Sequence, residues 1–283
     1  MDIIKASGEK QKFSKKKLYQ SLKRAGAQLS LAERVSKEIT KKISPGTSTK
    51  EILNQATFYL KKENPLLAAR YSLKKAIMEM GPTGFPFESY IAEILKQYGY
   101  NTKVRKIAKG YCVDHEVDVV AEKEKKNFMI ECKFHNSRGS HSDVKVALYV
   151  HARFLDVKSA WEQEPNNKYF FHEAWLATNT RCTSEAIRYA KCVGLKIISW
   201  RYPRNESLEY LIEKKGLYPI TVLLSLTRDA KEKLAEKQLV LANDLLKYSI
   251  SNLAKMTGLK SDIIKRLQEE AKNLQRPKKK NYE

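Results

Sequence analysis

Two predicted strands between His115 and Phe134 constrain this chain more than any other stretch, because they combine buried-strand patterning with clustered charges. The first strand carries Asp118, and the second carries Glu131 and Lys133 two residues apart. Side chains at positions i and i+2 of a strand leave the same face of a sheet, so Glu131 and Lys133 project together. Two carboxylates and a lysine on an otherwise apolar hairpin suit metal-assisted hydrolysis, in which carboxylates hold a divalent cation and a lysine orients or activates water.

The stretch 85–98, which precedes the hairpin, has the apolar periodicity of a helix. Gly81-Pro82-Thr83-Gly84 comes directly before it and marks a domain boundary. Glu88 falls at the edge of the apolar face of this helix. Taken alone, Glu88 is a first-turn acid that the helix dipole favours, but together with the hairpin it becomes a third acid for one site.

The residues after the hairpin alternate between helix and strand patterns. We expect helices over 143–162 and 184–192, and buried strands over 174–178 and 195–200. This order predicts a mixed α/β layer in which the late strands are parallel.

These motifs, taken in order, resemble the PD-(D/E)XK nuclease superfamily, and most closely its Mrr-like restriction endonuclease branch. The resemblance rests on the helix with Glu88, on Asp118, on Glu131-Cys132-Lys133 and on the strand–helix–strand segment 177–200. It implies a restriction-endonuclease-like α/β core, a mixed sheet flanked by helices, that hydrolyses phosphodiester bonds in DNA.

The same resemblance implies a role for each motif residue. Asp118, Glu131 and the main-chain carbonyl of Cys132 would hold Mg²⁺ or Mn²⁺, and Glu88 would be an outer ligand acting through water. Lys133 would position the attacking water. Each residue also has a structural alternative, because acids and ExK pairs are common in strands, but their joint occurrence favours the catalytic interpretation.

Neighbouring polar residues have less specific interpretations. Glu116 shares a strand face with Asp118 and is either a spare ligand or solvated. The loop after Lys133 is expected to hold the DNA backbone without reading its sequence, and its histidines are expected to be solvated. The polar side chains of this loop are His135, Asn136, Arg138, His141 and Lys145.

Residues 1–80 predict a small hairpin followed by four helices, the first of which Ser14 caps. This segment resembles an ATP-cone, a nucleotide-binding regulatory domain. The matching residues are Ile3-Ile4-Lys5, Ser7-Gly8, Phe13-Ser14, Lys17-Leu18, Ser21-Leu22, Arg24-Ala25, Thr49, Glu51-Ile52 and Ala68-Ala69-Arg70-Tyr71.

The ATP-cone resemblance implies a site for ATP or dATP at Ile3, Lys5, Ser14, Lys17 and Thr49. Ile3 would contact the base, and the two lysines would clamp phosphates together with N–H groups at the start of the first helix. Where the family commonly carries Arg and an acid, this chain has Ala6 and Gln11. The alternative is a small basic helical domain that binds DNA or packs on its neighbour.

The C-terminal region, 205–283, is predicted to be helical, with helices over 208–214, 221–226 and 229–247. Two further short helices surround Thr257-Gly258-Leu259 and resemble a helix-hairpin-helix element, which binds phosphate through backbone N–H groups. The alternative is a plain αα-hairpin. The last residues, RPKKKNYE, predict a disordered basic end.

Composition restricts the class of partner. The 283 residues include 54 Lys and Arg against 32 Asp and Glu, a net charge of +22, which favours a polyanion such as DNA. The basic residues are spread along the chain, which disfavours a membrane-surface helix. No signal peptide or membrane-spanning run is recognised, and the four cysteines lack CxxC spacing, so we expect reduced thiols and a cytoplasmic protein without zinc.

The sequence therefore predicts three parts: an ATP-cone over 1–80, an endonuclease domain over 84–204 and a helical region over 205–283. Nucleotide binding is expected to regulate DNA cleavage, with homo-oligomerisation as one route, and analogy with the branch implies restriction or phage defence. Two alternatives stay open. One is a non-catalytic, nucleotide-responsive DNA-binding regulator, and the other is a DNA repair or junction nuclease.

Overall fold

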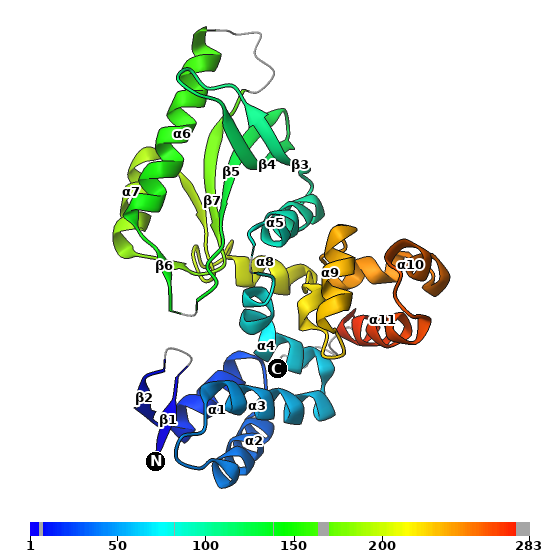
Figure 1. Cartoon of the computed structure of the whole chain (residues 1–283). Helices are drawn as coiled ribbons and strands as arrows, with labels where there is room; N and C mark the ends of the chain where they lie inside the picture. The colour runs from blue at the N-terminus through cyan, green and yellow to red at the C-terminus, as the bar shows by residue number, and fades with distance from the viewer. Residues whose placement is uncertain (6–7, 82, 138, 164–169, 276–283) are drawn as a thin grey trace. The chain divides into compact units, whose positions relative to one another are not determined.

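The computed structural model describes residues 1–5, 8–81, 83–137, 139–163 and 170–275 (Figure 1). The chain forms two compact units: Met1–Ile77 with the chain from Tyr218 onward, and Met78–Leu217. Residues 205–217, which the sequence-based division places in the C-terminal region, thus belong to the second unit. Among the described residues, no helix has both the length and the apolar character needed to cross a bilayer.

The second unit is built on a five-stranded mixed sheet of order β3-β4-β5-β7-β9. The first three strands are antiparallel, and the pairs β5–β7 and β7–β9 are parallel, which confirms the predicted mixed fold. The strands are β3 (Asn101–Ala108), β4 (His115–Lys123), β5 (Lys126–Lys133), β7 (Glu173–Thr178) and β9 (Lys196–Ile198). A separate parallel pair consists of β6 (His141–Ser142) and β8 (Arg181–Cys182).

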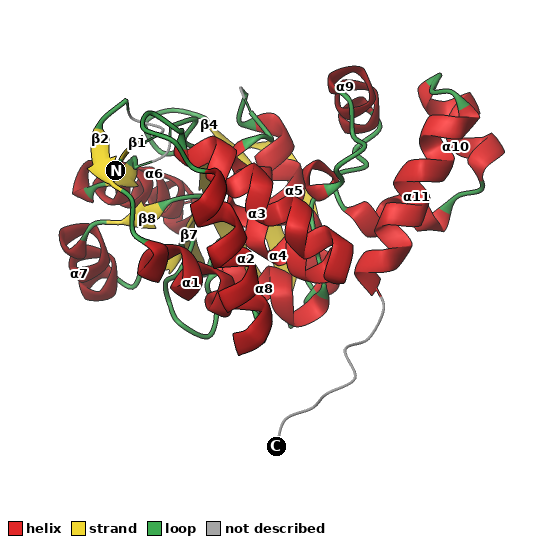
Figure 2. Cartoon of the chain, turned by 90° about the horizontal axis from the view of Figure 1, so that it is seen from below, coloured by secondary structure: helices red, strands yellow, loops and turns green. Residues whose placement is uncertain are grey.

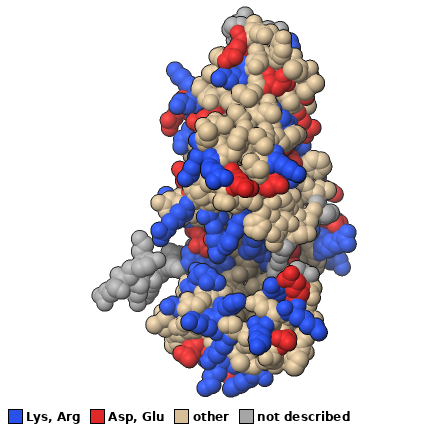
Figure 3. Space-filling model, turned by 90° about the vertical axis from the view of Figure 1, so that its left-hand side faces the viewer, with Lys and Arg blue, Asp and Glu red and all other residues tan. Residues whose placement is uncertain are grey.

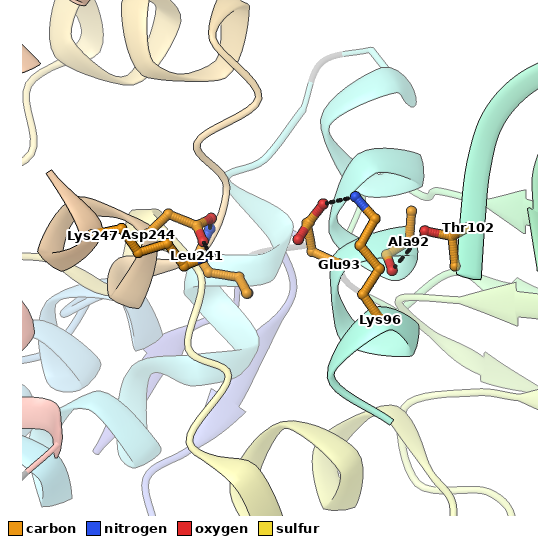
Figure 4. Close-up of polar contacts among 7 residues, drawn as sticks. All are labelled: Ala92, Glu93, Lys96, Thr102, Leu241, Asp244 and Lys247. Atoms are coloured by element: carbon orange, nitrogen blue, oxygen red, sulfur yellow. Dashed lines mark hydrogen bonds and ion pairs between the residues drawn. The ribbon is translucent and has the colours of Figure 1, made fainter. Parts of the chain in front are cut away.

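Helices cover both faces of this sheet (Figure 1). One face packs against α6 (Val144–Gln163) and α7 (Ser184–Val193) through a core that includes Val150, Leu176 and Ile197. The other face packs against α5 (Phe85–Gln97), and α8 (Leu208–Lys215) follows in the chain. The Thr102 hydroxyl donates to the Ala92 carbonyl and ties β3 to α5 (Figure 4).

The N-terminal part of the first unit follows the predicted pattern of a hairpin and four helices. Strands β1 (Asp2–Ile4) and β2 (Lys10–Lys12) precede α1 (Lys15–Arg24), α2 (Leu29–Lys42), α3 (Thr49–Glu63) and α4 (Pro65–Met78). Ser14 caps α1, as expected, and Ser48 with Glu51 forms a capping box at α3. The helices bury one apolar cluster that includes Ile3, Leu22, Ile39 and Leu60.

The C-terminal part of the first unit is helical but less regular than expected. It contains 3₁₀ helix η1 (Ile220–Val222), α9 (Arg228–Glu236), η2 (Ala242–Lys247), α10 (Ile250–Thr257) and α11 (Ser261–Gln275). The last two helices form an αα-hairpin (Figures 1 and 2). Asp244 stabilises η2 by accepting the Leu241 N–H and pairing with Lys247 (Figure 4).

Two predicted helices of this region are wrong. The stretch 221–226 contains only the end of η1, and 229–247 is interrupted after α9 by Gln238, whose φ is +56°. The Val240 carbonyl accepts the Ile220 N–H, and the Tyr218 carbonyl accepts the Ala242 N–H, so this segment pairs with a distant one instead of continuing a helix. Three consecutive apolar residues, 239–241, are buried there, which a helical periodicity does not accommodate.

Candidate active site

The candidate site begins at Asp118, where strand pairing is interrupted on both sides. In the β3–β4 register, Val104 pairs with Val119 and Lys106 pairs with Val117. Arg105 and Asp118, which lie between these pairs, are not paired. The β4–β5 register ends at Val119–Ile130, one position before Asp118 and Glu131. This break in strand pairing at Asp118 is called the gap, and Asp118 and Glu131 are the first residues beyond the register that β4 and β5 share.

The Asp118 carboxylate replaces one of the missing backbone contacts. Its Oδ2 accepts the Cys132 N–H at 2.7 Å, which joins β4 to β5 just beyond the end of their register. This bond fixes Asp118 beside the Glu131-Cys132-Lys133 motif. The structure thus brings together Asp118 and the ExK residues that the sequence predicted for one site.

Glu88 approaches the same gap from α5. Its side chain is only 9% exposed, and its Oε2 lies 3.4 Å from the Arg105 guanidinium. Arg105 adopts φ +48° within β3, an uncommon conformation for a residue other than glycine, at the position where the register is interrupted. The strand irregularity therefore allows an arginine to pair with the third acid.

The charge of Asp118 acts on both of the other acids. Burial raises the pKa of Glu131 to about 7, and the negative charge of Asp118 adds to this shift. Burial likewise raises the pKa of Glu88 to about 7, again with a contribution from Asp118. Burial also raises the pKa of Asp118, which the Cys132 N–H and Arg153 partly oppose. Like charges in a partly buried site disfavour ionisation, so this cluster would gain from a bound cation.

Lys133 completes the motif at the end of β5. Its side chain is exposed, and its positive charge lowers the pKa of Glu131. The side chain of the neighbouring Cys132 is a poor metal ligand, because burial and the three acids together raise the pKa of its thiol well above the usual value. The thiol therefore stays protonated, and the main-chain oxygen is the metal-binding atom that this residue offers.

The donor set fits Mg²⁺ or Mn²⁺ better than a softer metal. Among the residues that the structure describes, no group of three or more His, Cys, Asp and Glu side chains could hold a metal ion. Asp118, Glu131 and a carbonyl are all oxygen donors, and Mg²⁺ is commonly held by one or two carboxylates while it keeps several waters. An ion bound here would thus complete its coordination with water and substrate oxygens.

Sequence reasoning missed Arg153 of α6, which pairs with Glu131. Arg153 also donates to the Glu116 carbonyl and, from Nε, to His115 Nδ1 at 3.4 Å. The helical spacing in the sequence could have identified Arg153, because it lies between Val150 and Val157 on the face of α6 that points into the core. A cation on an inward helix face requires a partner, and a carboxylate is the natural one.

His115 and His135 are both withdrawn from solvent. His115 Nε2 lies 2.7 Å from Asp156 Oδ2, and its side chain is mostly buried. His135 is half-buried and contacts the Ser142 hydroxyl at 3.0 Å, so it is not the solvated loop residue we expected. Arg138 of the same loop lies outside the described residues.

The residues expected to bind nucleotide belong to three adjacent segments. The Ile4 N–H donates to the Thr47 carbonyl, and the Phe13 N–H donates to the Met1 carbonyl, so β1 lies next to the starts of both α3 and α1. Lys17 is exposed in the first turn of α1, and Thr49 begins α3. Lys5 forms an ion pair with Glu9 at 2.9 Å.

Two features of these segments affect how a nucleotide could bind to them. Ile3 is 7% exposed and belongs to the apolar core of the first unit. The first turn of α1 is Lys15-Lys16-Lys17, which adds positive charge to the N–H groups at the helix start. Both the helix dipole and these lysines favour an anion at that end.

Two N–H groups in the turn of the αα-hairpin near the C-terminus have acceptors within the hairpin. The Gly258 N–H donates to the Ala254 carbonyl at 2.8 Å, and the Leu259 N–H donates to the Thr257 hydroxyl. Asp262 in the first turn of α11 adds negative charge where a phosphate would lie. These contacts favour the plain αα-hairpin over a phosphate-binding helix-hairpin-helix.

Comparison with known proteins agrees with this architecture. Family models match an ATP cone domain at residues 1–78, a restriction endonuclease domain of the Mrr type at 79–202 and an AF1548-like C-terminal region at 218–275. An uncharacterized protein of Archaeoglobus fulgidus is 39% identical over 184 residues, which are 65% of this chain and 99% of the relative.

A solved structure gives the same relationship. The crystal structure of the protein of unknown function AF1548 is 36% identical, has a TM-score of 0.59 and covers 68% of this chain and 98% of its own. The order of the matched domains confirms the two resemblances found in the sequence. The chain therefore belongs to the AF1548-like family, with an ATP-cone domain followed by an Mrr-type restriction endonuclease domain.

Proposed function

We propose that this protein is a metal-dependent endonuclease that hydrolyses phosphodiester bonds in DNA and responds to ATP or dATP. The observation that carries the proposal is the gap in strand pairing at Asp118, where burial and the charge of Asp118 raise the pKa of Glu88 and of Glu131 beside Lys133. Such a cluster is costly for a purely structural sheet, and clustered perturbed carboxylates are typical of functional sites.

The roles of the residues follow from their chemistry. Asp118, Glu131 and the Cys132 carbonyl would hold Mg²⁺ or Mn²⁺, and the ion would supply Lewis-acid stabilisation of the developing phosphate charge. Lys133, exposed beside Glu131, would orient the attacking water and offset negative charge. Glu88 would accept hydrogen bonds from water in the outer shell.

DNA is the proposed substrate because of charge. The whole chain has a net charge of +22, and on the face shown in Figure 3 Lys and Arg are distributed widely, with acidic groups between them. Distributed cations attract the phosphate backbone without reading base sequence. The family match to a restriction endonuclease domain supports the same substrate.

Cleavage assays with purified protein test this proposal. With Mg²⁺ or Mn²⁺ we expect nicking or cutting of plasmid DNA, and Glu131→Ala or Lys133→Ala should reduce the rate by about 10²-fold or more while DNA binding is retained. Lys126→Ala, at the other end of β5, is the matched control and should cut like the wild type. Branched substrates in the same assay would identify a repair or junction nuclease.

A non-catalytic DNA-binding regulator is the second candidate. It is favoured by the ion pair between Arg153 and Glu131, which already gives one expected metal ligand a cationic partner. DNA binding without cleavage in the presence of either metal ion, and at every nucleotide concentration, would establish the regulator and reject the nuclease.

A further inference from the structure

Arg153 lies beside Glu131, one of the acids of the candidate site. Its guanidinium pairs with Glu131 and donates to the Glu116 carbonyl, while its carbon lies 5.3 Å from the centre of the Tyr149 ring. The Arg153 side chain is 11% exposed, whereas Tyr149 is 56% exposed. The guanidinium therefore contacts both a partly buried carboxylate and an exposed aromatic ring.

A second set of contacts holds Arg153 in this position. Because Arg153 Nε donates to His115 Nδ1, the proton of a neutral His115 is on Nε2, which donates to Asp156 at 2.7 Å. Asp156 also accepts the N–H groups of Cys112 and Val113, at 2.8 Å and 3.3 Å. The loop before β4 thus orients Arg153 through Asp156 and His115.

This arrangement conflicts with a divalent cation on Glu131. A metal ion held by Asp118 and Glu131 would replace the guanidinium as the partner of Glu131, and it would repel the guanidinium. A guanidinium released there remains beside the site, and its planar fork matches the oxygens of a phosphate.

We propose that Arg153 competes with the metal ion for Glu131 and moves to a DNA phosphate when the metal binds. The inference rests on the proposed nuclease function. Before metal binding, Arg153 offsets the charge of Glu131 and prevents weak or incorrect cation binding. After metal binding, the same side chain contributes positive charge to the bound substrate.

Manganese binding and DNA cleavage by Arg153→Gln test the inference with two readouts. Calorimetry without DNA should show Mn²⁺ binding that is about 5- to 30-fold tighter than in the wild type, because the competing cation is gone. Cleavage at saturating Mn²⁺ should nevertheless be about 10²-fold slower, because the phosphate loses a partner. A residue with a merely structural role would not change the two readouts in opposite directions.

Two further variants serve as controls. Lys158→Gln removes one positive charge from the same helix, at an exposed side chain paired with Glu162, and should leave both measurements unchanged. Arg153→Lys keeps a charge beside Glu131, so it should bind Mn²⁺ about as weakly as the wild type and recover part of the cleavage rate.

Several outcomes would overturn the inference. Weaker Mn²⁺ binding by Arg153→Gln would show that Arg153 supports Glu131 as a ligand, and unchanged cleavage would show that it does not act on the phosphate. If Arg153→Gln does not fold, Arg153→Lys provides the test. Mn²⁺ binding by Arg153→Lys that is much weaker than binding by the wild type would reject competition between residue 153 and the metal ion for Glu131. A wild type that binds no Mn²⁺ or does not cut would instead reject the nuclease proposal itself.

Discussion

At the residue scale, Glu88 has the clearest consequence for stability. Burial, followed by the charge of Asp118, raises its pKa from 4.5 to about 7 in the folded protein. Between these two pH values the folded protein holds a proton that the unfolded chain has released, so the free energy of unfolding falls as pH rises. The full decrease in the free energy of unfolding is reached above about pH 7.

Glu88→Gln removes this titration. In metal-free buffer, the free energy of unfolding of the wild type should fall between pH 5 and pH 8. The fall should be about 2 kcal/mol smaller for the variant. Urea unfolding at intervals of one pH unit measures the difference. Glu93→Gln, at a carboxylate of the same helix that pairs with Lys96 and is 20% exposed, should follow the wild type. Parallel curves for Glu88→Gln and the wild type would contradict the assigned pKa.

The candidate site residues differ in how far the sequence revealed them. Asp118, Glu131 and Lys133 follow a strand pattern with a known spacing, and Glu88 follows a helix pattern. The inward position of Arg153 could be read from its helix pattern, but the partners of Arg153 and Arg105 could not, because they are 22 and 17 residues away in the chain. Local periodicity does not report contacts of that separation.

At the scale of elements, the loop between β3 and β4 is held against α6 by Asp156. A Cβ on Gly110 would lie 2.1 Å from the Val113 carbonyl oxygen and 2.2 Å from Asp156 Oδ2. The Val113 contact is to backbone, which cannot move without distorting the loop. Glycine is therefore required there by close approach.

Gly110→Ala should accordingly destabilise the protein by about 1–3 kcal/mol, as judged by chemical denaturation. Gly84→Ala is the control, because its Cβ would meet only the Glu88 carboxylate at 3.4 Å and its φ of −73° suits alanine. That change should be close to neutral or slightly stabilising. Equal stability of Gly110→Ala and the wild type would contradict the tight packing of this loop.

At the scale of the whole molecule, the chain passes between the two compact units twice, near residue 77 and near residue 217. The ATP-cone belongs to the first unit and the proposed active site to the second. Regulation by nucleotide therefore requires that binding in one unit change the behaviour of the other, and both binding and cleavage should be measured.

Calorimetry with ATP and dATP should show binding by the wild type, and Lys17→Ala should weaken it about 10-fold or more, because it removes a charge at the start of α1. Lys23→Ala, in the last turn of the same helix, is the control and should bind normally. Nucleotide should also change the rate of DNA cleavage by the wild type but not by Lys17→Ala. Absence of heat at millimolar nucleotide would remove the sensor from the proposal.

The sequence by itself determined the order of most elements and the motif residues, because helix and strand periodicity, caps and spacing are local properties. It predicted α1 to α8, the hairpin β4–β5 and the parallel late strands, since each depends on a short run of residues. It failed at 229–247, where a buried segment pairs with residues about twenty positions earlier in the chain.

The tertiary structure alone decided how the motif becomes a site. It placed the gap in strand pairing at Asp118, turned Arg105 toward Glu88, and brought Arg153 from α6 onto Glu131. The physical reason is that a buried charge is stabilised by whichever partner packing brings near, and packing depends on the whole fold.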